Sequence, residues 1–284
     1  MNKIQNVQPS VNEQIYIHPF LKWAGGKRWL APLIHKQIGH VTGRYIEPFL
    51  GSGAMFFRLQ PKKAILNDSN AELINTYEAI RLDHNRVEKL LVQHQRLHSN
   101  KYYYQMRDYS PRCGFRRAAR FIYLNRTCWN GLYRVNLNGI FNVPIGTKTS
   151  VLLSGDNWAG VADLLQHAKL YSDDFEKIID QAKSGDLIFA DPPYTVKHNL
   201  NGFIKYNEFL FSWADQERLG TALQRAANRG AVIISTNANH VSIRTLYKES
   251  FRLLTMERNN VLSADPKFRG RYQELLIVSG SIWD

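Results

Sequence analysis

The sequence predicts an α/β protein in which a doubly wound, largely parallel sheet is interrupted by one inserted segment. Short apolar runs alternate with amphipathic runs in the first part of the chain and again after about residue 154, as strands alternate with helices. A stretch rich in arginine and tyrosine separates the two parts. We therefore expect residues 1–82 and 154–284 to form one domain, with residues 83–153 inserted into it.

The expected elements follow from local residue preferences. A β-rich run at 44–47 precedes a glycine loop, a helix over 54–59 and a buried strand at 64–66. Asn70 is suited to cap a helix that runs to about Leu82 and carries an apolar face. The later part predicts strands near 169–172, 187–190, 231–235, 252–256 and 274–278, and helices near 175–183, 213–228 and 241–249.

The inserted segment is predicted to be helical up to about Tyr123 and to end in a β-hairpin. Asn138-Gly139 lies between apolar residues, which is a strong hairpin signal. From Arg81 to Lys148 there are thirteen Lys or Arg against three Asp or Glu, a net charge of +10 in a chain of net charge +13. Aromatic residues are interleaved with these cations, which favours a nucleic-acid surface over a solvated basic face.

The composition points away from other classes. With 284 residues, 44% of them hydrophobic and 21% charged, the chain is typical of soluble globular proteins. It has no apolar run long enough to cross a bilayer and no secretory signal. Two cysteines predict neither a disulfide framework nor a thiolate metal site. We expect a cytoplasmic protein without metal, membrane contact or obligate protein partner.

The most specific motif is Asp191-Pro192-Pro193-Tyr194, which directly follows the apolar run at 187–190. Two prolines end the strand and stiffen the loop, because they cannot donate ladder hydrogen bonds. Ligands of open α/β sheets bind outside the carboxyl ends of the strands. A carboxylate, a proline carbonyl and an aromatic ring there suit a flat heterocycle that carries an amino group. The tetrapeptide alone also fits a simple proline-stiffened turn.

Three further stretches suit a nucleoside cofactor. The loop Phe49-Leu50-Gly51-Ser52-Gly53 precedes a helix, and its glycines let backbone approach a ligand closely. Asp68 lies at the end of the next strand, where a carboxylate can accept hydrogen bonds from both ribose hydroxyls. The alternative is that Asp68 merely starts the following helix. Trp23 and Lys27 flank a glycine turn suited to close over a cofactor tail, with Lys27 reaching a carboxylate; an ordinary exposed turn is the alternative.

In this order, and together with the stretches 123–126, 129–134 and 141–146, these motifs resemble the Dam-type (D12 class) adenine-specific DNA methyltransferases from about Phe20 to Val278. The resemblance implies a Rossmann-like, S-adenosylmethionine-dependent methyltransferase. It also implies that residues 83–153 form an inserted, mainly helical plus β-hairpin domain that recognises double-stranded DNA.

The resemblance implies a role for individual residues. Asp191, the carbonyl of Pro192 and the stacking ring of Tyr194 would carry out catalysis on a flipped adenine. The cofactor would contact Trp23, Lys27, Phe49, Gly51, Gly53, Asp68, Asp173, Phe175 and Asp191. For Asp173, helix capping by this residue or by Asp174 is the alternative. DNA would contact Arg116, Arg117, Arg126, Trp129, Asn130, Leu132, Arg134 and Pro144.

Arg134 suits a bidentate contact to guanine. Cations suited to phosphates, which position DNA without specifying it, are Arg116, Arg117, Arg120 and Arg126. Further contacts to the backbone, or an ordinary exposed loop, are expected at Arg258, Asn259, Asn260 and 269–271.

GATC is the expected target, although Dam-type enzymes have tyrosine where this chain has Trp129. A methyltransferase of the cytosine amine or of RNA, and a non-catalytic DNA-binding module, are the alternatives; Asp191 favours adenine. A solitary enzyme and a restriction-modification enzyme both fit.

Overall fold

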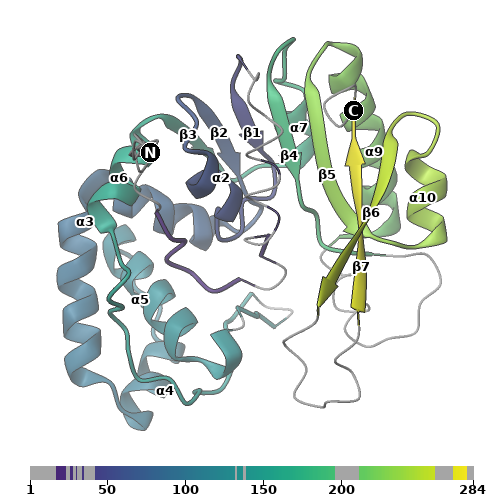
Figure 1. Cartoon of the computed structure of the whole chain (residues 1–284). Helices are drawn as coiled ribbons and strands as arrows, with labels where there is room; N and C mark the ends of the chain where they lie inside the picture. Colours follow the sequence, from purple (N-terminus) through teal and green to yellow (C-terminus); the bar gives the residue numbers. More distant parts are fainter. Residues whose placement is uncertain are drawn as a thin grey trace, which may run out of the picture.

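The computed structural model describes residues 17–23, 26–27, 30, 34, 42–131, 133–136, 139–195, 211–259 and 271–279. Within this part the strands form one seven-stranded sheet, in the order β3-β2-β1-β4-β5-β7-β6 (Figure 1). The strands are β1 (Tyr45–Glu47), β2 (Ala64–Asn67), β3 (Ala168–Tyr171), β4 (Leu187–Ala190), β5 (Val232–Ala238), β6 (Arg252–Asn259) and β7 (Arg271–Val278). Among these strands β7 pairs antiparallel with β5 and β6, and the other pairings are parallel. The predicted α/β class is confirmed, with a mostly parallel sheet that contains one antiparallel strand, β7.

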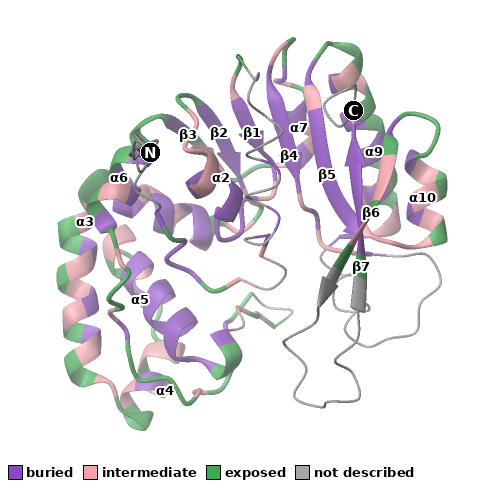
Figure 2. Cartoon of the chain, in the orientation of Figure 1, coloured by how far each residue is buried: buried purple, intermediate pink, exposed green. Residues whose placement is uncertain are grey.

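Helices cover both faces of the sheet, because successive strand residues point to opposite sides. Ile46, Ile65 and Ile188 face one helical layer. This layer consists of α7 (Phe175–Ile179), α9 (Trp213–Asn228) and α10 (Val241–Tyr247). Tyr45 and Leu66 face the opposite layer. That layer contains α2 (Ala54–Leu59), α3 (Ala71–Leu97), α5 (Gly114–Thr127) and α6 (Trp158–Gln166). Figure 2 shows that the central strands β1, β4 and β5 are largely buried, whereas the edge strand β6 is intermediate to exposed.

The order of the strands reverses between β1 and β4. The chain passes from β1 outward to β2 and β3, then returns to pair β4 with the other side of β1 and continues to β5. In open α/β sheets such a reversal creates a crevice outside the carboxyl ends of the strands. The residues that end β1 and follow β4, Glu47 and Asp191, therefore stand at the position where a ligand is expected.

The inserted segment forms a helical unit beside the sheet, with α4 (Asn100–Asp108) packed on α5 and α5 packed on α3. The helix expected to end near Leu82 continues to Leu97, with non-helical φ and ψ at Asp83. The expected segment boundary at 82/83 therefore falls on a kink. Val87 and Leu91 beyond this kink belong to the same buried cluster as Tyr45 and Leu66, so the helical unit shares its core with the sheet.

Local prediction was accurate for most elements. The helices at 54–59 and 213–228 and the strand at 187–190 are confirmed residue for residue. The helix expected at 175–183 ends at Ile179, and the residues that follow form tight turns. The predicted hairpin forms through an isolated bridge between Val135 and Phe141, with the N–H of Gly139 donating to the carbonyl of Asn136. No described helix combines the length and the apolar character that crossing a bilayer requires.

His94, in the second half of α3, is a buried histidine with aromatic neighbours. Its Nδ1 lies 2.8 Å from the Tyr102 hydroxyl, and its ring stacks on Tyr123 with centroids 4.8 Å apart. Burial, aided by the charge of Arg120, lowers the pKa of His94 from 6.5 to about 4. The histidine therefore stays neutral in the folded protein at pH values where it is protonated in the unfolded chain.

We expect the free energy of unfolding to fall as the pH is lowered from about 6.5 to about 4. In this range His94 is protonated in the unfolded chain and neutral in the folded protein. This difference lowers the free energy of unfolding by up to about 3 kcal/mol. Urea unfolding at pH 7 and pH 4.5 measures the loss, which should be smaller in His94→Gln. The exposed His167 supplies the control, His167→Gln, which should keep the wild-type loss. Equal losses in wild type and His94→Gln would contradict the assignment.

Candidate active site

Four carboxylates gather near the carboxyl edge of the sheet. Glu47 ends β1, Asp68 follows β2, Asp191 follows β4, and Glu274 lies on β7. Because β2, β1 and β4 are adjacent and parallel, the first three lie at one edge. This acidic group stands in a chain of net charge +13. An acidic site in a basic protein favours a ligand that carries positive charge near these strands.

Asp191 is anchored through one of its two oxygens. The Nζ of Lys27 lies 3.1 Å from Oδ1 of Asp191. The hydroxyl of Thr236, on β5, donates to the same oxygen over 2.6 Å. The Asp191 side chain is 20% exposed, whereas that of Lys27 is 4% exposed. The carboxylate is thus held from inside the protein and still reaches the surface of the site.

Tyr194 is tied to the same group. Its hydroxyl donates to Oε2 of Glu274 over 3.4 Å, and the Nζ of Lys27 lies 4.9 Å from its ring centroid. Lys27 also pairs with Glu274 at 3.7 Å. Lys27 was predicted to reach a cofactor carboxylate, but its ammonium is bound to two protein carboxylates. Lys27 therefore supports Asp191 and Tyr194 in this structure, and its contact with a cofactor carboxylate stays a prediction.

Glu47 is the most buried acid of the edge, at 2% exposure. Burial raises the pKa of Glu47 well above its usual range. The Tyr45 hydroxyl, which donates to Oε2 of Glu47 over 2.8 Å, lowers this pKa, and the negative charges of Asp191 and Asp68 raise it further. The buried Glu47 carboxyl therefore keeps its proton to a higher pH than an exposed glutamate does.

The loop 49–53 is a tight backbone cradle. Gly51 and Gly53 have φ angles of 51° and 64°, a region that favours glycine. A Cβ on Gly51 would lie 2.8 Å from the indole of Trp23. The Gly51 carbonyl accepts from the Tyr77 hydroxyl at 3.0 Å, and its N–H donates to Oδ2 of Asp68 at 3.0 Å. Trp23, the glycine loop and Asp68 are thus assembled, as the sequence predicted for a cofactor site.

Asp68 and Asn70 divide two tasks after β2. Asn70 caps α3 by accepting from the N–H groups of Glu72 and Leu73, which confirms the predicted cap. Asp68 accepts from the N–H of Asn70 through Oδ1, at 3.0 Å. Burial raises the pKa of Asp68, and the hydrogen bonds from the backbone N–H groups of Asn70 and Gly51 lower it. Asp68 therefore links the glycine loop to the end of β2 and is not itself the cap.

The segment that contains Asp173 is held by its backbone. The Asn67 side chain accepts from the N–H of Asp173 at 2.9 Å and donates to its carbonyl at 3.0 Å. The Asp173 carboxylate is exposed and pairs with Lys177 at 3.0 Å. Asp174, not Asp173, caps α7 by accepting from the N–H of Glu176. The capping alternative for Asp173 is thus answered: the cap is its neighbour.

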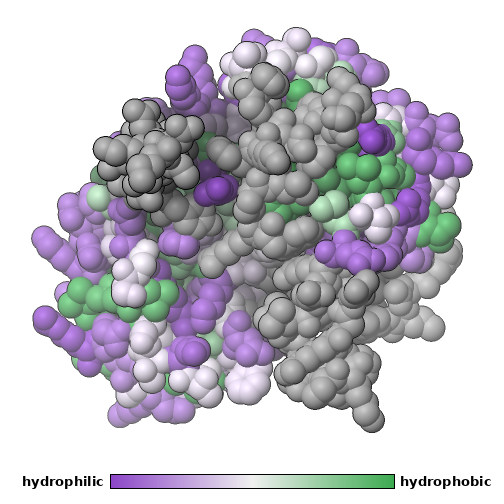
Figure 3. All heavy atoms as spheres, in the orientation of Figure 1, coloured by the Kyte–Doolittle hydropathy of each residue, from purple (hydrophilic) through white to green (hydrophobic). Residues whose placement is uncertain are grey.

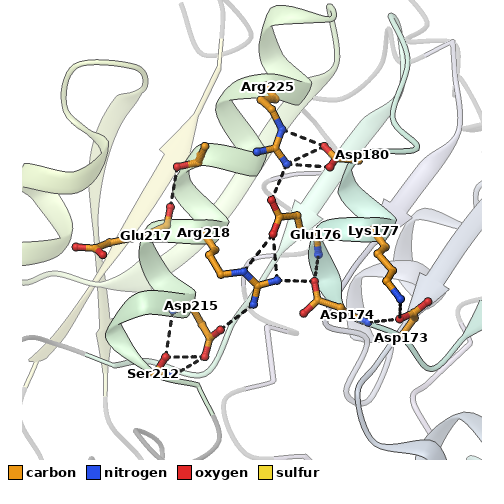
Figure 4. Close-up of polar contacts among 11 residues, drawn as sticks. Asp173, Asp174, Glu176, Lys177, Asp180, Ser212, Asp215, Glu217, Arg218 and Arg225 are labelled. Carbon is orange, nitrogen blue, oxygen red and sulfur yellow. Dashed lines mark hydrogen bonds and ion pairs between the residues drawn. The ribbon is translucent and has the colours of Figure 1, made fainter.

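An ion-pair network joins α7 to α9 beside this segment (Figure 4). Arg218 binds Asp174 at 2.8 Å and Glu176 at 3.0 Å, and its guanidinium lies 4.9 Å from the ring centroid of Phe175. The Phe175 ring packs in turn on Phe49, with centroids 5.4 Å apart. The network therefore braces an aromatic pair that links α7 to the glycine loop.

The hairpin presents a polar face and an apolar face. Arg134 and Asn142 are exposed and joined by a hydrogen bond of 3.1 Å from Nε of Arg134. Tyr133 and Phe141 point inward, and Tyr133 stacks on Trp23 with centroids 5.6 Å apart. The hairpin thus rests on Trp23 while Arg134 faces outward.

The turn before the hairpin exposes a large ring. The Trp129 side chain is exposed, with 53% of the residue accessible, and the backbone N–H of Trp129 donates to the carbonyl of Pro144 at 2.9 Å. Asn130 follows with a φ of 54°. Leu132, predicted to contact DNA, lies outside the described residues. In the face seen in Figure 3, hydrophilic side chains gather at the lower left, where α3, α4 and α5 lie, around one hydrophobic patch.

Arg126, predicted to bind DNA phosphate, is a buried structural residue. Its guanidinium pairs with both oxygens of Asp156 at 2.6 and 2.7 Å. It also donates to the carbonyls of Phe20 and Val151. Its side chain is 1% exposed, so it does not reach DNA, and the prediction is wrong. The spacing of the arginines along the basic segment does not show which of them is buried.

Two other arginines, Arg117 and Arg120, form contacts within the protein. Arg117 pairs with both oxygens of Glu72, with the Nε contacts at 3.1 and 3.2 Å. Arg120 donates to the carbonyls of Met106 and Arg107. These contacts hold both arginines, each half-buried, against the helical unit, and their phosphate contacts stay predictions. Arg116 is exposed, as a phosphate contact requires.

Several residues near the site were missed by sequence reasoning. Glu274 and Thr236 lie on strands more than forty residues from Asp191, and only the sheet order brings them together. Asn125 is fully buried and holds the backbone of Lys22 by two hydrogen bonds, of 2.9 and 2.8 Å. The signal for Asn125 was its place within the stretch 123–126.

The sheet order and the acidic, glycine-rich and aromatic groups at its carboxyl edge define a class of α/β proteins that bind a nucleoside-type ligand at the switch point. A family model, D12 class N6 adenine-specific DNA methyltransferase, matches residues 23–262. This chain belongs to that family, and it is an adenine-specific DNA methyltransferase.

Curated relatives match over nearly their whole length. The type II methyltransferase M1.LlaDCHI of Lactococcus lactis subsp. cremoris is 35% identical, over 94% of this chain and 96% of that protein. The type II methyltransferase M.MjaIII of Methanocaldococcus jannaschii is 32% identical, over 93% and 99%. The DNA adenine methylase of Serratia marcescens is 31% identical, over 91% and 97%.

The family implies S-adenosylmethionine as cofactor, and the residues present fit it. A Cβ would fill the cradle at Gly51 beside Trp23, so backbone and indole leave room only for a glycine. The acidic group suits a positively charged sulfonium.

Gly51→Ala tests the cradle. We expect S-adenosylmethionine affinity to fall by about tenfold or more, because left-handed backbone costs an alanine about 1–2 kcal/mol and the methyl would displace Trp23. Isothermal titration calorimetry measures the affinity. Gly155→Ala is the control, since nothing lies within 4 Å of a Cβ there and its φ is not positive. Unchanged affinity in Gly51→Ala would exclude a close cofactor approach to this loop.

Proposed function

We propose that this enzyme methylates N6 of an adenine that is flipped out of duplex DNA, and that its target is GATC. One observation carries the catalytic part of the proposal. Asp191 has one oxygen bound to Lys27 and Thr236 while its side chain remains partly exposed, and the same Lys27 ammonium lies 4.9 Å from the ring centroid of Tyr194. A fixed carboxylate next to an aromatic ring suits a planar base with an amino group.

The adenine amine is a poor nucleophile, because its lone pair is delocalised into the ring. Asp191 and the backbone carbonyl of Pro192 accept its two hydrogens, which favours a tetrahedral nitrogen with a directed lone pair. Tyr194 stacks on the flipped base, which recovers part of the few (~2–4) kcal/mol that unstacking costs. S-adenosylmethionine, when bound, supplies an electrophilic methyl group.

The cofactor lies, in this proposal, between the glycine loop and the ends of β1 and β2. The residues that hold it are Trp23, Phe49, Gly51, Gly53 and Asp68. Asp68 accepts hydrogen bonds from the ribose hydroxyls. Phe175, packed on Phe49, covers the adenine ring of the cofactor, and Asp173 lies at its edge.

Residues 83–153 provide target recognition in this proposal. The exposed hairpin face directs Arg134 toward guanine, where a bidentate contact is worth about 1–3 kcal/mol of discrimination. Arg116 contacts phosphate, which positions DNA without specifying its sequence. Trp129 enters the DNA, flanked by Asn130, Leu132 and Pro144. The indole in place of the tyrosine expected at this position changes the shape of the inserted group.

Transfer of labelled methyl groups from S-adenosylmethionine tests the target. Duplexes with one GATC site are compared with duplexes that differ from it by a single base pair, and the product nucleosides are identified. We expect N6-methyladenine from GATC and at least about tenfold slower transfer to each variant, as loss of one base contact predicts. Equal transfer to a variant would reject GATC at that position. Methylcytosine, or transfer to RNA alone, would reject the proposed substrate.

We also infer a cytoplasmic enzyme of the modification type. Cys113 and Cys128 are both free thiols, which suits a reducing compartment. Two of the relatives described above carry type II in their names. Protection of methylated plasmid from a restriction enzyme with the same target is the expected consequence.

A further inference from the structure

Thr236 contributes a hydroxyl to the active site from a distant strand. It lies near the carboxyl end of β5 and is 1% exposed. In the β4–β5 register Ala190 faces Ser235, so Thr236 stands beside Asp191. Its Oγ1 donates to Oδ1 of Asp191 over 2.6 Å. A short hydrogen bond from a buried hydroxyl to a carboxylate is a strong one.

The two oxygens of Asp191 are therefore unlike. Oδ1 is bound by the Thr236 hydroxyl and the Lys27 ammonium. Among the described residues, the hydrogen bond to the Asp191 side chain reaches Oδ1, and no hydrogen bond reaches Oδ2. Since Lys27 and Thr236 approach the carboxylate from the interior, they fix its rotation as well as its position. Glu274 also binds the Lys27 ammonium, at 3.7 Å.

We propose that Thr236 is a positioning residue for methyl transfer, whose hydroxyl and the Lys27 ammonium bind Oδ1 of Asp191 so that Oδ2 is the oxygen offered to the target amine. This inference rests on the proposed role of Asp191. A carboxylate that rotates about its Cβ–Cγ bond presents its lone pairs in many directions, and alignment is a large part of catalysis without a covalent intermediate. Thr236 restricts that rotation from the rigid centre of the sheet.

The neighbouring residue supplies a matched control. Ser235 also lies on β5, is fully buried and donates its hydroxyl over 2.9 Å, but to the backbone carbonyl of Ala190. Adjacent strand residues point to opposite faces. Loss of either hydroxyl thus removes one buried hydrogen bond from the same strand, and only the loss at Thr236 frees the carboxylate.

The experiment compares Thr236→Val, Thr236→Ser and Ser235→Ala with wild type. The substrate is an unmethylated DNA duplex that contains the target sequence identified by the transfer experiment above. The measurements are the single-turnover rate of methyl transfer, the dissociation constants for DNA and S-adenosylmethionine, and the melting temperature. We expect Thr236→Val to slow transfer about 10- to 100-fold, the range for a hydrogen bond to a charged group. Both dissociation constants should stay within about twofold. Thr236→Ser should restore most of the rate, and Ser235→Ala should lose less than about threefold.

Three outcomes overturn the proposal. A wild-type rate in Thr236→Val shows that the hydroxyl is dispensable. Equal losses of rate in Thr236→Val and Ser235→Ala, with equal losses of melting temperature, show a general effect of β5. Weaker binding of DNA or of S-adenosylmethionine by Thr236→Val, with an unchanged single-turnover rate, shows that Thr236 acts in binding.

Asp191→Ala separates this inference from the proposed function. If Asp191→Ala retains transfer, the role of Asp191 is rejected and that of Thr236 with it. If Asp191→Ala is inactive while Thr236→Val is unaffected, only the inference about Thr236 fails.

Discussion

Asp191→Ala should reduce the rate of methyl transfer by at least about 10³-fold, while S-adenosylmethionine and DNA still bind. The change removes the proposed acceptor of the amine hydrogens, and catalysis here depends on positioning and electrostatics. It also leaves Lys27 with Glu274 as its remaining partner within the group. Single-turnover transfer of labelled methyl groups measures the rate, and calorimetry and fluorescence anisotropy measure the two affinities.

The control for this change is Asp163→Ala, an exposed carboxylate on α6. It should transfer at the wild-type rate. A melting temperature measured for both variants shows whether a lost rate reflects a lost fold. Transfer by Asp191→Ala within tenfold of wild type would reject the acceptor role. A loss confined to DNA affinity would instead make Asp191 a binding group.

Arg126→Met should lower the free energy of unfolding by about 3–5 kcal/mol, the cost of leaving one member of a buried ion pair alone. Asp156, 10% exposed on its side chain, loses both of its guanidinium hydrogen bonds. The carbonyls of Phe20 and Val151 lose their donors as well. Urea unfolding followed by circular dichroism measures the change.

The same experiment distinguishes the buried role of Arg126 from the phosphate role that the sequence predicted. A phosphate contact would weaken DNA binding and lower its salt dependence while leaving stability unchanged. Arg112→Ala, an exposed arginine of the same basic segment, should change stability by less than about 0.5 kcal/mol. Wild-type stability in Arg126→Met, with weaker DNA binding, would restore the original prediction.

The sheet elements were largely predictable because their signals are local. The run at 187–190 is apolar and ends at two prolines, and β4 ends where they begin. Asn70 has the side chain that a helix start requires, and it caps α3. The long reach of α3 was not predicted, because its second half buries His94 and Leu91 against α5 rather than presenting a simple apolar face. Tertiary packing extended a helix that local pattern ended near Leu82.

The candidate site divides in the same way. Asp191, Tyr194, Asp68 and the glycine loop were named from the sequence, because each follows a strand and each has a residue type suited to its chemistry. The contacts of Asp191 with Lys27 and Thr236, and of Tyr194 with Glu274, were not predicted, because these partners come from three separate parts of the chain. The basic segment misled for a related reason: arginine is counted as a surface charge, and Arg126 is buried against a carboxylate.

By itself, the sequence determined the fold class, the family and the motif residues, since strand ends, glycine turns and proline stops are encoded over a few neighbouring residues. Tertiary structure decided which oxygen of Asp191 is held, which arginines face inward and which strand supplies Glu274. Those outcomes depend on the order of strands in the sheet and on contacts between distant segments, because a side chain gains its role from the groups that surround it in space.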